Sequence, residues 1–388
     1  MTTIYLIRHA QADGNLYRRC QAWYDSLVTP AGYQQIKALE ARFRDTHFDA
    51  VYSSDLFRTM TTAKAIYKSH NLPLNTDPGL REINSGVWED RPWGELLQND
   101  RESFLSFWRC DPAWQVEGSE TFGGVQKRFN SAIRKIASDH LGQTVAVFAH
   151  GCIIRVTLAY WLGIPLERIR EVPHGDNTSV AKLELDGEQL KVCWYNDISH
   201  LPDELAHAPH PAAESDAETA SRMESSSLYF CPLDLPNAQE TYLNARENAW
   251  LASHGSMDGF DGEAFLRHAM ACHEDSPDSI LTAMLAGKPA GILQMDFQSE
   301  AEQSVGRIPF VYMEPEIRDH GLGVQLLGQA VSTFRALGRK YLRLRCAPEN
   351  TFAQHFYQKY GFYKVGEEPG GTGCLDTLEK YIGTDDIS

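Results

Sequence analysis

Two histidines each follow a short apolar run of the sequence. Arg8 and His9 come directly after the run Thr3–Ile7, which is rich in β-branched residues. His150 closely follows a second such run, Thr144–Phe148. Runs of this kind are typical of buried strands, and the sites of open α/β sheets form beyond the carboxyl ends of their strands. The sequence therefore predicts that both imidazoles lie at the same end of one sheet.

An arginine and a glutamate are candidates to join the two histidines. Arg58 lies in the first turn of a helix predicted to follow the strand Phe48–Ser53, with Asp55 as its cap. Glu82 lies in a loop that contains Gly86. A neutral imidazole is a good nucleophile toward phosphorus, and fixed positive charges stabilise a transferring phosphoryl group. These residue types together favour phosphoryl transfer that needs no metal ion.

The elements around these residues predict an α/β domain over residues 1–200. Strands alternate with helices, which implies a mainly parallel sheet. One helix begins at Pro30 with Thr29 as its N-cap. An apolar helix is predicted at Cys152–Leu162, directly after the second histidine.

Five ordered motifs of this domain resemble those of one family. They are Leu6–Asn15, Tyr52–Arg58, Leu80–Glu89, Phe148–Gly151 and Asn177–Ser179. The set resembles the histidine phosphatase superfamily and implies its three-layer, phosphoglycerate mutase-like α/β fold. The sequence departs from the family at Ala10 and Ala12, where glycine and threonine are usual, and neither change removes a charged group.

The resemblance implies a role for each charged residue of the motifs. His9 would be the nucleophile that forms a phosphohistidine. Glu82 would protonate the leaving oxygen and then deprotonate the attacking water. The residues that would neutralise or bind the phosphoryl oxygens are Arg8, Arg58, protonated His150, Asn15 and Gly151. Two neighbours, Arg155 and His174, are expected to have structural roles.

Residues 201–226 differ in composition from the chain on either side. The part 201–221 contains three prolines and five carboxylates but no lysine or arginine. Such a composition is typical of a linker between domains. The remaining residues, 227–388, predict a second domain of mixed α+β type, with a hairpin across Gly287 and an amphipathic helix at Gly323–Leu337.

The second domain has a glycine-rich turn between a predicted strand and that helix. Glycines let backbone amides approach a ligand closely, and a helix N-terminus favours an anion. The turn, Met313–Val324, and a later run, Asn350–Phe362, resemble the acyl-CoA-binding motifs of the GNAT superfamily of N-acetyltransferases. The resemblance covers about residues 227–383 and implies a mixed, splayed sheet.

Acetyl-CoA is the cofactor that this resemblance implies. Backbone amides from Arg318 to Val324 would hold its pyrophosphate, and the Met313 backbone would pair with its pantetheine arm. Tyr357 would protonate the departing thiolate. The residues assigned to the cofactor are Met313, Arg318, Asp319, His320, Gly321, Leu322, Gly323, Val324 and Asn350. No general base stands out, and the candidates are Gln294, Glu300, Glu302 and Glu314.

The composition narrows the classes of partner and the cellular location that are expected for the protein. A formal net charge of −16 disfavours nucleic acid and anionic membranes as partners. The eight cysteines are scattered and form no CxxC, so neither a disulfide framework nor a metal site is expected. The N-terminus lacks the apolar stretch of a signal peptide, and no run reaches about 18 apolar residues. A cytoplasmic location is therefore expected.

These inferences together predict a bifunctional enzyme. The first domain would hydrolyse a small-molecule phosphomonoester without a metal, and the second would transfer an acetyl group from acetyl-CoA to an amine. Two alternatives stay open: a phosphoglycerate-type mutase in the first domain, and a second domain that binds CoA as a regulatory module without turnover. The sequence does not specify the phosphomonoester, nor whether the acceptor amine belongs to a small molecule or a protein.

Overall fold

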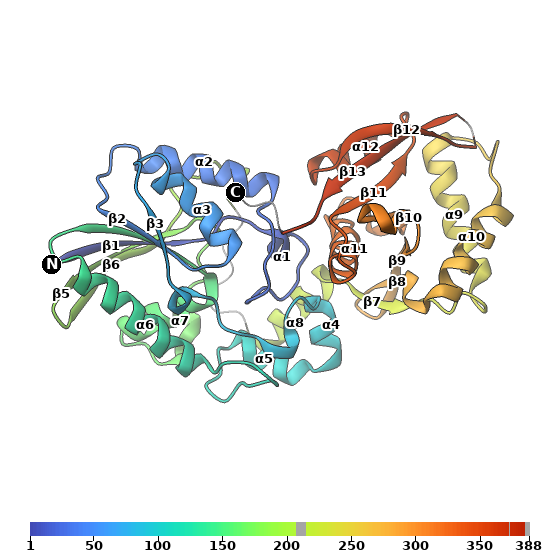
Figure 1. The fold of residues 1–388 in the computed structure, drawn as a ribbon. Helices are drawn as coiled ribbons and strands as arrows, with labels where there is room; N and C mark the ends of the chain where they lie inside the picture. Colours follow the sequence, from blue (N-terminus) through green and yellow to red (C-terminus); the bar gives the residue numbers. More distant parts are fainter. Residues whose placement is uncertain (207–214, 372, 385–388) are drawn as a thin grey trace. The chain divides into compact units, whose positions relative to one another are not determined.

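The computed structural model describes residues 1–206, 215–371 and 373–384. They form two compact units, each described here by itself (Figure 1). The first unit comprises Met1–Asn15, Arg19–Arg91 and Leu96–Arg222, and the second comprises Leu16–Arg18, Pro92–Glu95 and Met223–Ser388. None of the helices in the described ranges is long and apolar enough to cross a membrane.

The first unit is built on a six-stranded sheet with the order β3-β2-β4-β1-β5-β6. Its strands are β1 (Thr2–Arg8), β2 (Ala50–Ser53), β3 (Leu74–Thr76), β4 (Thr144–Ala149), β5 (Val180–Asp186) and β6 (Gln189–Asp197). Strands β1 to β4 pair in parallel, whereas β5 and β6 are antiparallel to their neighbours. The predicted mainly parallel sheet is confirmed.

Helices cover both faces of this sheet and give the predicted three layers (Figure 1). α2 and α3 lie on one face, where Leu39 and Ile66 pack with Val51 and Phe148 of the strands. α6 and α7 lie on the other face. The helices before the predicted linker are α1 (Asp13–Leu16), α2 (Pro30–Phe43), α3 (Phe57–Tyr67), α4 (Trp93–Asn99), α5 (Arg101–Trp108), α6 (Phe122–Asp139) and α7 (Gly151–Trp161).

Of the two predicted helix caps, one is confirmed and the other is wrong. Thr29 caps α2 as predicted, since its side chain accepts an amide of the first turn. The prediction that Asp55 caps α3 is wrong, because its carboxylate pairs with Arg81 instead, with 2.7 Å between Oδ1 and Nε. Asp25 caps α3 in its place, and its Oδ1 accepts the amide of Phe57 at 2.8 Å.

The predicted linker, 201–226, ends in a helix. This helix, α8, spans Asp216–Ser226, and residues 207–214 of the segment lie outside the described residues. The carboxylate of the first residue of α8 pairs with Arg170 at 2.5 Å and also with Arg109. The described end of the segment is therefore attached to the first unit by ion pairs.

The second unit contains a seven-stranded sheet with the order β12-β13-β11-β10-β9-β8-β7. Its strands are β7 (Tyr229–Pro232), β8 (Ile280–Leu285), β9 (Lys288–Asp296), β10 (Val305–Met313), β11 (Tyr341–Cys346), β12 (Tyr363–Pro369) and β13 (Cys374–Tyr381). β10 and β11 pair in parallel, and the other neighbouring strands are antiparallel. Within the described residues the parallel pairing ends at Ile308, whereas β10 continues beside β9 to Met313. The two parallel strands therefore separate, as predicted for a splayed sheet.

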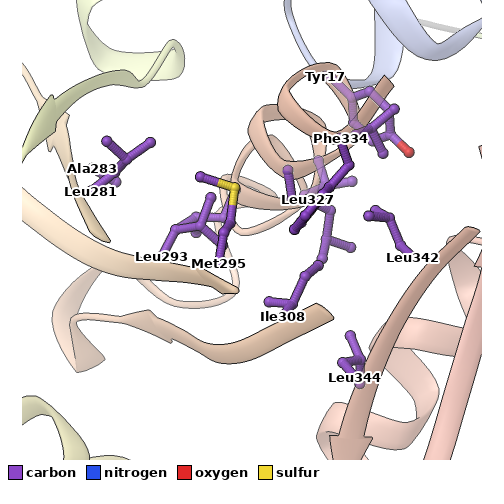
Figure 2. Packing of buried hydrophobic residues seen from close by; sticks show 14 of the residues in the cluster. Tyr17, Leu281, Ala283, Leu293, Met295, Ile308, Leu327, Phe334, Leu342 and Leu344 are labelled. Atoms are coloured by element: carbon purple, nitrogen blue, oxygen red, sulfur yellow. The ribbon is translucent and has the colours of Figure 1, made fainter. Parts of the chain in front are cut away.

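Helix α11 packs on the centre of this sheet. The helices of the unit are α9 (Gln239–His254), α10 (Gly262–Asp275), α11 (Val324–Ala336) and α12 (Thr351–Lys359). Figure 2 shows Leu327 and Phe334 of α11 in one apolar cluster with Leu293 and Ile308 of the strands. The Phe334 ring lies directly against Gly306, where a Cβ would be 2.3 Å from ring atom Cγ. Glycine at this position therefore allows the helix to pack closely on β10.

Candidate functional site

The carboxyl ends of β1 and β4 bring His9 and His150 together. The two strands are parallel neighbours, in a register that places Arg8 beside Ala149. The imidazole rings that follow have centroids 5.3 Å apart. Both side chains are buried, with His9 4% exposed and His150 0% exposed. The structure thus places both imidazoles at one end of the sheet.

The His9 ring is held in one tautomer. Its Nδ1 lies 2.8 Å from the carbonyl oxygen of Ala10, and because a carbonyl oxygen only accepts, Nδ1 carries the ring proton. Burial lowers the pKa of His9 well below its usual value, and the charges of Arg58 and Arg8 lower it further. His9 is therefore a neutral imidazole whose Nε2 lone pair is available for attack.

Two guanidinium groups lie close to this imidazole. Arg58 is fully buried and donates from Nη2 to the oxygen of Ala22 at 2.6 Å and from Nη1 to that of Tyr24 at 3.2 Å. Arg8 donates from Nη1 to the oxygen of Gly175 at 2.5 Å. The Nε atoms of both arginines are buried and bond to none of the described residues. Each arginine therefore keeps a donor for a further partner.

His150 has one ring nitrogen bonded and one unbonded. Its Nε2 lies 2.9 Å from the Oγ of Ser54, a hydroxyl that also accepts the Leu56 amide at 3.3 Å. In the tautomer in which this hydroxyl donates to Nε2, the ring proton lies on Nδ1. Its Nδ1 is buried and has no hydrogen-bond partner in the described part of the chain. Burial and the charge of Arg58 lower the pKa of His150 well below its usual value, so the protein's own charges keep the ring neutral. The predicted protonated form therefore requires the negative charge of a phosphoryl group beside it.

Glu82 closes the N-terminus of α7. Its Oε2 accepts the amide of Cys152, and its Oε1 accepts those of Ile153 and Ile83, each at 2.9 Å. Burial raises the pKa of Glu82, while the three amide bonds and a nearby arginine oppose the rise. A carboxyl group with a raised pKa keeps its proton to higher pH than an exposed one, as a general acid requires.

Arg128 of α6 positions the loop that carries Glu82. Its Nη1 donates to the carbonyl oxygens of Gly79 at 3.0 Å and Arg81 at 2.9 Å, and its Nη2 to that of Glu82 at 3.1 Å. The Glu120 carboxylate holds the same guanidinium at 2.8 Å. Sequence reasoning missed Arg128, because no local pattern links a helix residue to a loop 46 residues earlier.

Asn15 and Gly151 lie at the edge of the site. Asn177 donates from Nδ2 to the carbonyl oxygen of His9 at 2.9 Å and lies 3.4 Å from Oδ1 of Asn15. Since Asn15 uses Oδ1 as an acceptor, its Nδ2 is left to donate. A Cβ at Gly151 would lie 2.9 Å from the Nε of Arg8, so the glycine leaves room for that guanidinium.

Arg155 holds the 3-10 turn Leu166–Glu171 in place. Its Nε donates to the oxygen of Val172 at 2.8 Å, and its Nη2 to that of Ile169 at 3.1 Å. Its Nη1 lies 2.7 Å from the Nε2 of His174. These bonds fit the structural role predicted for both residues.

In the second unit, the turn between β10 and α11 presents a run of backbone donors. Asp319 and Gly321 adopt left-handed conformations, with φ of 64° and 71°. Over the described ranges no residue accepts a hydrogen bond from the N–H groups of residues 319–324. The side chains of Leu322 and Val324 are buried in the core and anchor the turn. Consecutive unpaired amides at a helix N-terminus suit an anion.

Met313 and Arg318, both predicted to contact acetyl-CoA, are bonded to each other. Met313 ends β10, and its carbonyl oxygen accepts a hydrogen bond from the Nε of Arg318 at 2.9 Å. The carbonyl oxygen of Arg318 in turn lies 2.8 Å from the Nδ1 of His320. These two bonds fix the path of the chain into the turn.

Asn350 and Tyr357 lie at the start and in the body of α12. Asn350 caps the helix by accepting the amide of Ala353 at 3.0 Å, and its Nδ2 donates to the Oγ of Ser253 at 2.9 Å. Both the oxygen and the nitrogen of the Asn350 side-chain amide therefore bond to the protein itself, which gives this residue a structural role. The Tyr357 ring packs against Phe362, and burial raises the pKa of its hydroxyl. The hydroxyl thus stays protonated, as a donor to a thiolate requires.

The four candidates for a general base differ in their surroundings. Gln294 is uncharged and fully buried, and Glu300 pairs with two arginines. Glu302 lies in an exposed turn. Glu314 directly follows β10 and accepts the hydroxyl of Tyr312 at 2.9 Å. Glu314 is therefore the candidate beside the turn that presents the unpaired amides.

Comparisons with known proteins match both units. The profile of the histidine phosphatase superfamily (branch 1) matches residues 4–198, and that of the acetyltransferase (GNAT) family matches residues 242–362. The putative phosphoserine phosphatase 2 of Hydrogenobacter thermophilus is 29% identical, over 52% of this chain and 98% of its own length. The probable phosphoglycerate mutase GpmB of Yersinia pestis is 31% identical, over 55% of this chain and 98% of its own length. The solved structure of Bacillus stearothermophilus YhfR matches with a TM-score of 0.50 and 33% identity, over 52% of this chain and 99% of that one.

The first profile spans half of the 388 residues, and it covers all the elements that carry the two imidazoles, the two guanidinium groups and the glutamate. The second profile covers the splayed strands and the turn with unpaired amides. The chain therefore belongs to the histidine phosphatase superfamily and carries a GNAT acetyltransferase domain after its phosphatase domain.

Proposed function

We propose that the chain is a bifunctional enzyme whose first domain hydrolyses a phosphomonoester through a phosphohistidine at His9. The observation that carries the proposal is a set of three buried nitrogen atoms without partners among the described residues: Arg8 Nε, Arg58 Nε and His150 Nδ1. Both Nε atoms are donors, and His150 Nδ1 is one when the ring is protonated or its Nε2 takes the Ser54 proton. A buried polar group left unsatisfied costs about 1–3 kcal/mol. Three such donors near one neutral imidazole favour a ligand that accepts from all of them, and a phosphoryl group has three peripheral oxygens to do so.

The reaction would take place in two steps. In the first, the Nε2 of His9 attacks phosphorus in line, the bond from phosphorus to the leaving oxygen breaks, and Glu82 gives that oxygen its proton. In the second, Glu82 takes a proton from water, the water oxygen bonds to phosphorus, and the bond to His9 breaks. Phosphate leaves, and both residues return to their starting states.

The electrostatics of the site suit this sequence of steps. Before phosphate binds, His9 and His150 are both neutral, because burial and the arginines lower their pKa values. A phosphoryl dianion would raise the pKa of His150 and add a third positive charge beside Arg8 and Arg58. This added charge on His150 would stabilise the negative charge on the phosphoryl oxygens in the transition state, while His9 stays neutral and able to attack.

The products separate hydrolysis from the mutase alternative. Phosphoserine and 3-phosphoglycerate are suitable first probes, since the relatives carry the names of a phosphoserine phosphatase and a phosphoglycerate mutase. We expect each mole of consumed substrate to release one mole of inorganic phosphate, measured by phosphorus NMR, with no dependence on added bisphosphoglycerate. Formation of 2-phosphoglycerate faster than free phosphate would establish the mutase instead.

Phosphatase activity is expected to survive treatment with EDTA. The Glu82 carboxylate is already bonded to three backbone amides. Within the described residues, the first unit has no group of three histidine, cysteine or carboxylate side chains close enough to share an ion. Turnover of an aryl phosphate should therefore stay within about twofold after chelation and dialysis. Loss of activity that added Mg²⁺ restores would contradict the metal-independent mechanism.

For the second domain we propose acetyl transfer from acetyl-CoA to an amine. The unpaired amides of residues 319–324 support a pyrophosphate site, and the separation of β10 from β11 leaves β10 backbone for the pantetheine arm. Tyr357, whose pKa is raised by burial, would protonate the thiolate that leaves. The segment 201–226 would link this domain to the phosphatase.

Replacing Gly321 by glutamate is expected to weaken acetyl-CoA binding by far more than tenfold. The residue lies in the middle of the unpaired amides, and its Cβ would point into open space, so the new carboxylate would meet the pyrophosphate with bulk and a like charge. Calorimetric titration of acetyl-CoA measures the change. Gly321→Ala is the matched control, because it carries the same backbone strain at φ 71°, about 1–2 kcal/mol, without the charge. Equal binding by both variants would remove the pyrophosphate site from this turn.

A further inference from the structure

A second cluster of reactive side chains lies in the second unit, away from the turn with unpaired amides. His268 and Cys272 lie four residues apart on α10, and Asp296 ends β9. Residues four apart share one face of a helix, so both α10 side chains can meet the end of the strand. One ligand atom from each residue lies within 4.8 Å of the other two. We infer that His268, Cys272 and Asp296 form a zinc site, with its fourth position open to solvent.

The separations of the three atoms suit one small ion. The Nε2 of His268 lies 3.1 Å from the Oδ2 of Asp296 and 3.7 Å from the Sγ of Cys272. Zinc takes nitrogen and oxygen at about 2.1 Å and sulfur at about 2.3 Å in a tetrahedron. Those bond lengths put nitrogen about 3.4 Å from oxygen and about 3.6 Å from sulfur. The two separations that involve the His268 nitrogen therefore differ from those of a zinc site by tenths of an ångström, and the Asp296 oxygen and Cys272 Sγ lie within 4.8 Å of each other.

An ion pair alone accounts for only part of this arrangement. The Nε2 of His268 carries at most one proton, and it can give that proton to Asp296 or to Cys272 but not fully to both. Both acceptors nevertheless converge on the same nitrogen. A divalent cation at the centre would bond to all three atoms at once, and the mixture of nitrogen, sulfur and oxygen favours zinc over magnesium or calcium.

Surrounding groups already hold two of the ligands. The Asp296 carboxylate accepts the hydroxyl of Ser299 at 2.6 Å and two backbone amides of the following turn. Gln294 lies with its Nε2 3.7 Å from the Sγ of Cys272. The orientation of that amide is fixed, because its oxygen accepts the Tyr242 hydroxyl at 2.7 Å. An N–H group directed at sulfur stabilises the thiolate that zinc requires.

The environment of His268 also allows the ion to enter. Its side chain is 45% exposed, whereas that of Asp296 is 10% exposed and Cys272 is 7% exposed. The other nitrogen of the ring, Nδ1, lies 3.4 Å from the Nε2 of Gln294. That amide nitrogen can only donate, so zinc bound at Nε2, which puts the ring proton on Nδ1, requires the ring and the amide to turn away from each other. The solvent-facing side of the cluster supplies the open fourth position.

Cobalt(II) titration of the full chain tests the proposal, because cobalt takes the same ligands as zinc and absorbs light. We expect one equivalent to give the near-ultraviolet band of a cobalt–thiolate bond and the visible bands of a four-coordinate ion, and added zinc to abolish both. Cys272→Ser should lose the thiolate band. His268→Gln and Asp296→Asn should each weaken binding at least tenfold.

Cys231→Ser is the matched control, because Cys231 is an exposed free thiol outside the cluster, and its binding should equal that of the wild type. Far-ultraviolet circular dichroism confirms that each variant is folded. If Cys272→Ser unfolds, His268→Gln decides the outcome, because the His268 side chain is half-exposed and its replacement should leave the fold intact. The absence of a thiolate band in the wild type, its persistence in folded Cys272→Ser, or cobalt binding by folded His268→Gln as tight as that of the wild type would overturn the proposal.

Discussion

Replacing His9 by alanine is expected to lower phosphatase turnover by at least about 1,000-fold, as the loss of a covalent nucleophile does in other enzymes. His9 is neutral and its Nε2 lone pair is available, because the ring proton lies on Nδ1, which donates a hydrogen bond to the Ala10 carbonyl oxygen. No other described group near the site combines an unprotonated nitrogen with this position at the end of β1. Hydrolysis of an aryl phosphate under saturating conditions measures the effect.

His47→Ala is a suitable control, since the His47 side chain is 83% exposed and lies at the surface. Its activity should remain that of the wild type. Rapid acid-free quenching with labelled substrate should trap an alkali-stable phosphoprotein in the wild type and in His47→Ala but not in His9→Ala. Residual activity above about 1% of wild type in folded His9→Ala, or a phosphoprotein that still forms, would exclude His9 as the nucleophile.

The architecture of both domains and the places of the main charged residues could be predicted from the sequence. A short apolar run specifies a strand, and the end of that strand specifies where the next side chain lies. His9 and His150 are therefore placed by two local patterns, Thr3–Ile7 and Thr144–Phe148, whose strands turn out to be parallel neighbours. Arg58 is placed by the same logic, in the first turn of the helix after β2.

What the sequence could not predict depends on contacts between segments far apart in the chain. Asp55 had every local property of a helix cap, yet Arg81 binds it and Asp25 caps α3 instead. Local sequence also does not show that Glu82 accepts amides of α7. Such choices are decided by competition among partners, and only the folded chain brings the competitors together.

The cluster on α10 illustrates the same limit. The spacing of His268 and Cys272 by four residues is a local signal for two ligands on one helix face. The third member, Asp296, comes from a strand 28 residues after His268. A search for cysteines close together along the chain therefore overlooks this cluster. Its two local members are a histidine and a cysteine, and its third member comes from a strand of the sheet.

Replacing Glu82 by glutamine is expected to lower turnover by about 100- to 10,000-fold, the usual contribution of a general acid. Glutamine keeps the size of the side chain but has no proton to give to the leaving oxygen. It also weakens the cap of α7, because glutamine has one oxygen to accept the three amides that bond to the two oxygens of Glu82. Thermal unfolding separates the two effects, and Glu117→Gln, at an exposed position, serves as the control.

The loss in Glu82→Gln should depend on the leaving group. A nitrophenolate leaves without a proton, so Glu82→Gln should slow the hydrolysis of p-nitrophenyl phosphate far less than that of an alkyl phosphate. His9→Ala should slow both reactions equally.

The pH profile gives a second signature. Glu82 must be protonated for the first step, so the wild-type rate should fall as pH rises through its pKa. Because burial raises that pKa, the fall should come at higher pH than for an ordinary carboxyl, and it should be absent in the variant. Equal losses for both substrates, with the same alkaline fall, would make Glu82 a structural cap of α7 and require another donor for the leaving oxygen.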